Sequence, residues 1–228
     1  MRASAVIVAA GSGLRLGMGQ PKAFVTLGGQ PMLFYSLRSA AAARSVVEIV
    51  VALPEGMAPA ARSLAELAGV KIPLKLVPGG PRRQDSVRHA LALVSAESEL
   101  VAIHDAARPL ASAALFDACL ATAERSGAAI AAIPSADTLK RVVDGQLVAT
   151  VERAELFQAQ TPQAFRRELI LRAHRAAYAD NWTATDDAQL CERLGATVQV
   201  VPGARDNFKI TTAEDLKMAE ALLGALAG

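Results

Sequence analysis

The chain has 228 residues, of which 52% are hydrophobic and 20% are charged, so it can bury a full core without disulfides or structural metals. Its formal net charge is +2, and it has no run of about five or more basic residues, which argues against a nucleic-acid partner. The short apolar N-terminal run lacks the features of a signal peptide, and no apolar stretch reaches about 18 residues. The sequence therefore predicts a cytoplasmic protein with no membrane partner.

Short β-rich segments alternate with helical ones over the first 133 residues. Several of the predicted strands are apolar at both odd and even positions, which is typical of strands covered on both faces. The pattern predicts a Rossmann-like α/β fold with a doubly wound, mostly parallel sheet. The predicted strands are residues 5–10, 48–53, 74–77, 100–104 and 128–133, and the predicted helices are residues 32–43, 58–68, 83–94 and 113–126.

The pattern changes after residue 133, where two alternating runs flank Asp144 and Gly145. An Asp-Gly pair between such runs favours a type I′ hairpin, and we expect residues 136–155 to project from the sheet as an arm. No linker or internal repeat interrupts the chain, so we expect one domain over residues 1–228. The remaining predictions are a Thr161-Pro162 turn, helices over 166–178 and 186–194, a strand over 197–201 and a closing helix from Ala213.

The stretch AVIVAAGSGLRLGMGQPKAF, residues 5–24, places a glycine-rich loop directly after the first strand. A dinucleotide fingerprint would need a third glycine where Leu16 stands, and an acid at the end of the second strand. A Walker A loop would need glycine before its lysine and a hydroxyl after it, whereas Lys22 follows Pro21 and precedes Ala23. Neither motif is present.

Two interpretations of this loop remain open. Backbone N–H groups of a glycine-rich turn can bind phosphate oxygens, and Arg15 and Lys22 could then hold a triphosphate. The alternative is an ordinary turn with solvated charges.

Three further stretches favour the phosphate site, because each follows a predicted strand or precedes a helix at one edge of the sheet. They are PGGPRRQDSVRHAL, IHDAARP and RDNFKITTAEDL, the last with Lys209 in a short strand before a helix capped by Thr211 or Thr212. We expect Arg15, Lys22, Arg108 and Lys209 to meet in one crevice. Purely structural roles stay open for single residues: Asp105 could cap a turn or pair with Arg108, and Asp85 could be a first-turn helix acid.

The two cysteines, Cys119 and Cys191, are far apart and fall in predicted helices. They form neither a CxxC pair nor a zinc cluster, and we expect them to be packing residues. The three histidines show no triad or metal spacing. The sequence therefore predicts no metal site made of protein ligands alone.

Taken in order, AAGSGLRLG with the following PK, GGPRRQDSV, HDAARP, DTLKR, QTPQAF, TDDA and DNFKIT cover nearly the whole chain. This ordered set resembles the 2-C-methyl-D-erythritol 4-phosphate cytidylyltransferase family. The resemblance implies a fold of the nucleotide-diphospho-sugar transferase type and transfer of CMP from CTP to methylerythritol phosphate, with release of pyrophosphate. It also implies a magnesium ion, and a homodimer in which each hairpin arm reaches the partner's active site.

The same resemblance implies roles for individual residues. Arg15, Lys22 and Lys209 would be catalytic, with Lys209 at the α-phosphate. Asp105 would hold the CTP ribose or the acceptor. The CTP-binding residues would be Ala9, Ala10, Gly11, Ser12, Gly13, Gly79, Gly80, Ser86 and Asp105; the acceptor-binding residues would be Asp105, Arg108, Thr138, Arg153 and Thr161.

Three other functions remain as alternatives. A different sugar- or polyol-phosphate nucleotidyltransferase would also suit a G-x-G-x-R loop followed by Pro-Lys, although DTLKR and QTPQAF argue against it. An NAD-linked oxidoreductase is disfavoured by the incomplete fingerprint. A non-catalytic nucleotide sensor with the same fold is the third.

Overall fold

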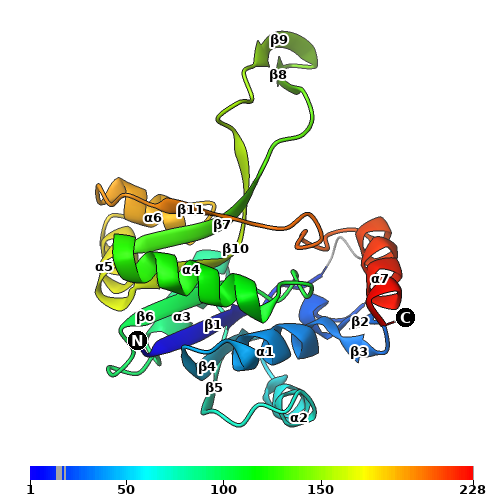
Figure 1. Cartoon of the computed structure of the whole chain (residues 1–228), viewed down its shortest axis with the longest axis vertical. Coiled ribbons are helices and arrows are strands. Elements are labelled where there is room, and N and C mark those ends of the chain that lie inside the picture. The colour runs from blue at the N-terminus through cyan, green and yellow to red at the C-terminus, as the bar shows by residue number, and fades with distance from the viewer. Residues whose placement is uncertain (14–16, 18, 228) are drawn as a thin grey trace.

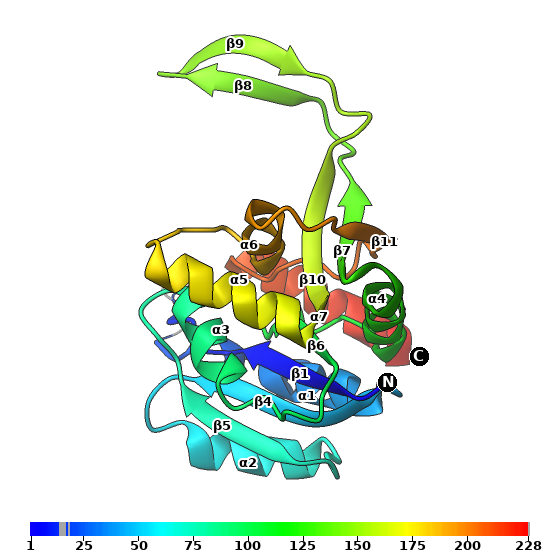
Figure 2. The same cartoon turned by 90° about the vertical axis from the view of Figure 1, so that its left-hand side faces the viewer.

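The computed structural model describes residues 1–13, 17 and 19–227. Within these residues, seven strands form one sheet in the order β11-β7-β10-β6-β1-β4-β5 (Figures 1 and 2). Every neighbouring pair is parallel except those that β10 makes with β6 and β7. The strands are β1 (Ala3–Val8), β4 (Val46–Leu53), β5 (Leu74–Pro78), β6 (Leu100–Asp105), β7 (Ala128–Pro134), β10 (Phe157–Arg166) and β11 (Gln199–Pro202). The predicted doubly wound, mostly parallel α/β fold is confirmed.

Helices cover both faces of the sheet, which explains why the strands are apolar at both parities. On one face, α1 (Met32–Ala42), α2 (Ala58–Leu67) and α4 (Ala113–Ser126) pack against the core that contains Ile7 and Ile49. On the other, α3 (Arg83–Leu91), α5 (Arg167–Ala179) and α6 (Asp187–Arg193) pack against Val6 and Ile103. The alternating side chains of β1 thus belong to two different cores.

A third, smaller core lies beside the sheet. It joins α7 (Ala213–Ala227) to the short strands β2 (Thr26–Leu27) and β3 (Gln30–Pro31), which follow the 3-10 helix η2 (Lys22–Phe24). Leu27, Tyr35 and Ile210 are buried in it. This packing ties the glycine-rich loop, through η2, to the C-terminal part of the chain.

The chain reverses its direction across the sheet at β1. From β1 it passes to β4 and β5 on one side and then crosses to β6 on the other. In open α/β sheets such a switch point opens a crevice at the carboxyl ends of the two strands, because their loops diverge to opposite sides. Here those ends are Val8 and Asp105, which are register partners.

Two local predictions are wrong. Thr161 and Pro162 lie inside β10 and not in a turn, and their peptide bond is cis. Proline lacks the N–H that a regular ladder needs, and the strand accommodates it where the pairing register shifts between Ala159 and Gln163.

Lys209 lies in a segment outside any strand of the described residues. A hydrogen bond from Ile210 N to Ala107 O holds that segment to the loop after β6.

The hairpin is confirmed. Strands β8 (Leu139–Val143) and β9 (Gln146–Val151) pair with each other and stand clear of the sheet (Figures 1 and 2). Asp144 and Gly145 have φ of 49° and 78°, and positive φ at both central residues is typical of the type I′ turn. Strands β7 and β10 run into the base of this arm.

None of the helices within the described residues has the length and apolarity needed to span a bilayer.

Candidate active site

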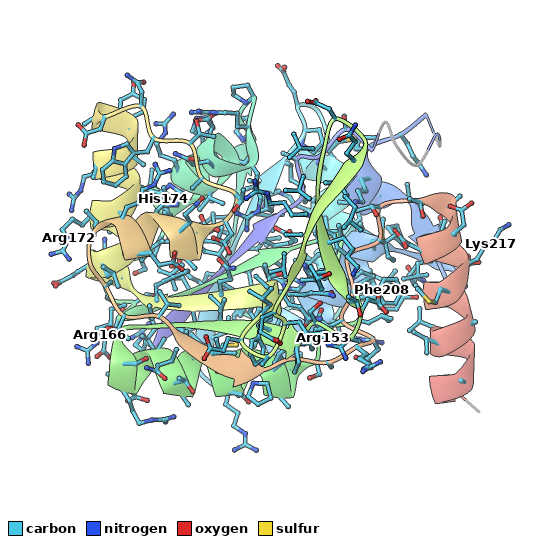
Figure 3. All side chains as sticks on the ribbon, turned by 90° about the horizontal axis from the view of Figure 1, so that it is seen from above. Arg153, Arg166, Arg172, His174, Phe208 and Lys217 are labelled. Carbon is cyan, nitrogen blue, oxygen red and sulfur yellow. The ribbon has the colours of Figure 1, made fainter. Side chains whose placement is uncertain are left out.

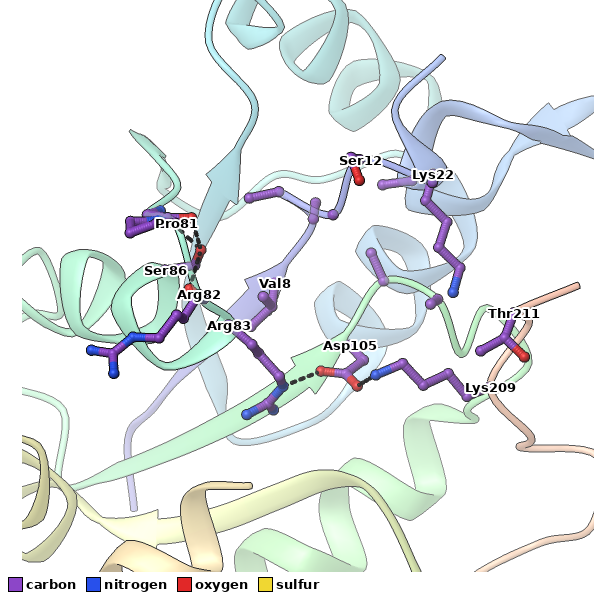
Figure 4. Close-up of a pocket in the computed structure, with 18 residues that line it drawn as sticks. Val8, Ser12, Lys22, Pro81, Arg82, Arg83, Ser86, Asp105, Lys209 and Thr211 are labelled. Carbon is purple, nitrogen blue, oxygen red and sulfur yellow. Dashed lines mark hydrogen bonds and ion pairs between the residues drawn. The ribbon is translucent and has the colours of Figure 1, made fainter. Parts of the chain in front are cut away.

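A pocket of about 520 Å³ lies at the carboxyl ends of β1 and β6 (Figure 4). Most of its lining comes from four segments: the loop after β1, the start of α3, the loop after β6 and the stretch before α7. The lining residues are Val8, Ala9, Ala10, Gly11, Ser12, Gly13, Lys22, Ala23, Gly80, Pro81, Arg82, Arg83, Ser86, Asp105, Ala106, Ala107, Lys209 and Thr211.

The loop after β1 begins at Ala9 and leads into η2, which begins at Lys22. Lys22 N donates to Gly11 O at 3.1 Å, which closes the loop. Gly13 has φ of 72°, and a Cβ there would lie 3.0 Å from both Gln20 O and Lys22 N, so glycine is required at this crossing. The predicted catalytic residue Arg15 lies outside the described residues.

The segment between β5 and α3 passes close to the first loop. A Cβ on Gly79 would lie 2.2 Å from the Cβ of Ala10, and a Cβ on Gly80 would lie 2.4 Å from that of Asp85. Gly80 N donates to Ser86 Oγ at 3.0 Å, so the first turn of α3 fixes this loop. Glycine is thus needed at both positions; Gly80 lines the pocket, whereas Gly79 lies against Ala10 and is not among the lining residues.

Asp105, the last residue of β6, lies on the pocket floor. Lys209 Nζ donates to its Oδ2 at 2.7 Å and Arg83 Nε to its Oδ1 at 2.8 Å. Burial disfavours the Asp105 carboxylate, but the positive charges of Arg83 and Lys209 outweigh that cost and hold its pKa well below the usual value. Asp105 is therefore a carboxylate paired with cations on two sides.

Lys22 and Lys209 both line the pocket, one from η2 and the other from the segment before α7 (Figure 4). Their side chains enter from elements nearly the whole chain apart in sequence. The side chain of Lys209 is partly exposed, whereas that of its partner Asp105 is largely buried. Of the four cations expected to meet in one crevice, Lys22 and Lys209 line the pocket, Arg108 does not, and Arg15 is outside the described residues.

Arg108 is placed differently. Its guanidinium donates to Asn207 O at 2.8 Å and to Ala159 O at 3.1 Å, and it does not belong to the pocket lining. It therefore ties the loop after β6 to β10 and to the segment that carries Lys209. The suggested Arg108–Asp105 ion pair is not among the contacts of the described residues.

Thr161 lies behind Asp105. Its Oγ1 accepts the Asp105 backbone N–H at 3.0 Å and lies 3.0 Å from His104 Nδ1. Only 4% of Thr161 is exposed.

Thr138 and Arg153 belong to the arm. Thr138 precedes β8 and Arg153 follows β9, and both are exposed. Arg153 donates to Ala136 O, which joins the two sides of the arm near its base. Neither residue lines the pocket of its own chain.

Sequence reasoning missed Arg83 and its partner Asp187. Both lie in the quoted motifs, RRQDSV and TDDA, but neither motif indicates which side chain faces which. Arg83 Nη1 donates to Asp187 Oδ2 at 2.7 Å across a separation of 104 residues. The sequence signal for Arg83 was the pair of adjacent arginines, Arg82 and Arg83, at the start of α3. Only one of two adjacent residues can face Asp105, and the sequence does not indicate which.

A doubly wound sheet with a pocket at its switch point, lined here by Lys22, Arg83 and Lys209, is typical of nucleotide-binding enzymes. The family model for 2-C-methyl-D-erythritol 4-phosphate cytidylyltransferase matches residues 3–225. The chain therefore belongs to the 2-C-methyl-D-erythritol 4-phosphate cytidylyltransferase family. It is an enzyme that transfers a cytidylyl group from CTP in isoprenoid biosynthesis.

Relatives with this name match nearly end to end. That of Deinococcus radiodurans is 47% identical, with 100% of this chain and 92% of the relative covered. That of Bacillus mycoides is 41% identical, with 96% of each covered. The crystal structure of the Thermus thermophilus protein superimposes with a TM-score of 0.81 at 37% identity, covering 97% of this chain and 98% of that one.

The bifunctional enzyme IspD/IspF of Anaeromyxobacter dehalogenans is 44% identical over 98% of this chain. This chain spans 58% of that relative's length.

Proposed function

We propose that the pocket binds CTP between the loop after β1 and the start of α3. The backbone of residues 9–13 and the cations Arg15, Lys22 and Lys209 would hold the triphosphate. Gly79, Gly80 and Ser86 would contact the cytosine. Support comes from the close approach of Gly79 to Ala10 and from the Gly80–Ser86 hydrogen bond, which give this wall a fixed shape.

The transfer joins two anions. A phosphate oxygen of methylerythritol phosphate attacks the α-phosphorus of CTP, a new P–O bond forms, and the bond to the β-phosphate breaks so that pyrophosphate leaves. Such a reaction needs charge neutralisation and in-line positioning more than a general acid or base. Lys22 and Lys209 supply positive charge from opposite ends of the chain, and their convergence is the observation that carries this proposal.

The acceptor would bind in the pocket next to Asp105, and this carboxylate would accept a hydrogen bond from an acceptor hydroxyl. Arg108 and Thr161 hold the backbone around that carboxylate. Thr138 and Arg153 would bind the acceptor phosphate in a partner subunit, since they are exposed and remain outside the pocket of their own chain.

The residues of the pocket suit a magnesium ion that arrives with the triphosphate. Within the described residues, no group of three His, Cys, Asp or Glu side chains could hold a metal alone. Magnesium commonly keeps several waters and binds through one or two carboxylates plus substrate phosphates. Asp105 supplies a carboxylate to the pocket lining, and the bound ion would neutralise phosphate charge.

We further propose a cytoplasmic homodimer of single-domain chains, residues 1–228, held through the arm of residues 136–155. Apolar side chains on this arm are exposed, including Val142 at 55% and Leu147 at 62%. Burial of such side chains favours association.

A donor and acceptor screen tests the proposal. With magnesium present, pyrophosphate release is expected with CTP and methylerythritol phosphate, and little with UTP, GTP or ATP. Turnover of UTP with a hexose phosphate, and none with CTP and methylerythritol phosphate, would overturn it. Tight NADH binding would instead favour an oxidoreductase.

A further inference from the structure

Asp105 is one member of a chain of paired groups that leads away from the pocket. Arg83 bridges Asp105 and Asp187, with Nε 2.8 Å from Asp105 Oδ1 and Nη1 2.7 Å from Asp187 Oδ2. Asp187 Oδ1 lies 2.9 Å from His174 Nε2. The series Lys209–Asp105–Arg83–Asp187–His174 thus connects the segment before α7 with β6, α3, α6 and α5.

The two ends of this series differ in burial. The side chain of Lys209 is 39% exposed, whereas those of Asp187 and His174 are 1% and 3% exposed. His174 lies on α5 among the helices on the far side of the molecule from α7 (Figure 3). A phosphate in the pocket can therefore reach Lys209, while the Asp187–His174 end of the series is enclosed by protein.

This difference matters once a triphosphate binds. The same Lys209 amino group that pairs with Asp105 is the group that would turn to phosphate oxygens. A largely buried carboxylate that loses its only cation is costly, but Asp105 keeps a second cation on its other oxygen. Arg83 suits this role because its planar guanidinium can bond two carboxylates at once.

We propose that Arg83, anchored by Asp187 and His174, is a positioning residue that keeps Asp105 charged and oriented while Lys209 engages the substrate phosphates. The inference rests on the proposed function of the pocket. It assigns Asp187 and His174 to the support of Asp105, although neither lines the pocket. The charge of Arg83 also holds the pKa of Asp187 below its usual value against the effect of burial.

A double-mutant cycle separates this role from a structural one. Arg83→Met in the otherwise native enzyme is expected to lower kcat/KM by about tenfold or more, the scale of one lost charge-assisted hydrogen bond. In an Asp105→Asn background the same change should cost less than about twofold, because Arg83 acts through Asp105. Equal losses in both backgrounds, or no loss in either, would overturn the proposal.

Two further variants keep the test decisive if Arg83→Met does not fold. Arg83→Lys should recover part of the lost kcat/KM, and Asp187→Asn should show the same dependence on Asp105 as Arg83→Met. If Asp187→Asn lowers kcat/KM equally in both backgrounds, the proposal fails. His174→Gln, which retains a donor for Asp187, should stay closer to the native enzyme than His174→Leu.

Glu48→Gln is the matched control. Glu48 is also a buried carboxylate paired with a lysine, Lys75, but it lies near the amino end of β4, at the opposite edge of the sheet. The Glu48→Gln variant should lower the midpoint of thermal unfolding without changing kcat/KM in the native or the Asp105→Asn background. The outcomes are distinguishable from failure of the proposed function, which would appear as absent cytidylyl transfer in the native enzyme.

Discussion

A single residue, His104, links the core of the sheet to the candidate active site through its hydrogen bonds. It is fully buried next to Asp105, and its Nε2 lies 3.2 Å from Arg108 O. A carbonyl oxygen can only accept, so Nε2 carries the proton and Nδ1 accepts from the Thr161 hydroxyl. That hydroxyl accepts the Asp105 N–H in turn. A neutral imidazole therefore fixes the backbone of the residue that pairs with both Lys209 and Arg83.

The buried position of His104 makes the free energy of unfolding depend on pH. Burial lowers the pKa of His104 to about 4, although the Asp105 charge opposes the shift. In the unfolded chain a histidine gains its proton below about pH 6.5. The unfolded state therefore binds more protons between these two values, and the free energy of unfolding falls as the pH drops from about 6.5 to 4.

Replacing the titrating group should remove that dependence. Urea unfolding of the native protein and of His104→Asn, each at pH 7 and pH 4.5, is the measurement. The native protein should lose about 2 to 3 kcal/mol more than the variant between these two pH values. Equal losses would contradict a neutral, buried His104.

Among the helices and strands, the sequence predicted correctly those in which the hydrophobic pattern and the residue types favour the same structure. Strands β1, β4 and β6 have long runs of Val, Ile and Leu or Ala, and the Asp144-Gly145 pair specifies the arm turn. Strand β10 was missed because Phe157–Arg166 combines glutamine, alanine and proline, which have low strand propensity. Its place between β6 and β7 is fixed by tertiary pairing.

The candidate site, too, could be predicted only in part. The loops that follow β1 and β6 could be placed from the sequence because the carboxyl ends of parallel strands share one edge. The contacts of Arg83 could not, since Asp105 and Asp187 lie 22 and 104 residues away in sequence. Arg108 was expected in the crevice as an acceptor-binding residue, but its guanidinium donates to the backbone carbonyls of Asn207 and Ala159.

At the scale of the whole molecule, the arm requires an explanation. It stands clear of the sheet (Figure 1). Val142, Leu147 and other apolar side chains of the arm are exposed to solvent. A two-stranded hairpin has little independent stability, so a partner that covers it would stabilise it. In the homodimer that we propose, the arm would also carry Arg153 to the partner's pocket.

Complementation tests this assembly. Differently tagged Arg153→Ala and Lys22→Ala chains are co-expressed and the mixed dimers purified. One of the two sites then has both native residues, so about half of the native activity is expected. Verified mixed dimers no more active than either parent would mean that the arm does not complete the partner's site.

We propose that Lys22 and Lys209 together stabilise the charge at the α-phosphorus of CTP. Steady-state kcat for Lys22→Ala and for Lys209→Ala tests it most directly, with Lys217→Ala, an exposed lysine on α7 (Figure 3), as the control. Each pocket variant should lose about 100-fold or more in kcat, the scale of one lost transition-state contact, and Lys217→Ala should keep native turnover. Native kcat in both pocket variants would contradict it.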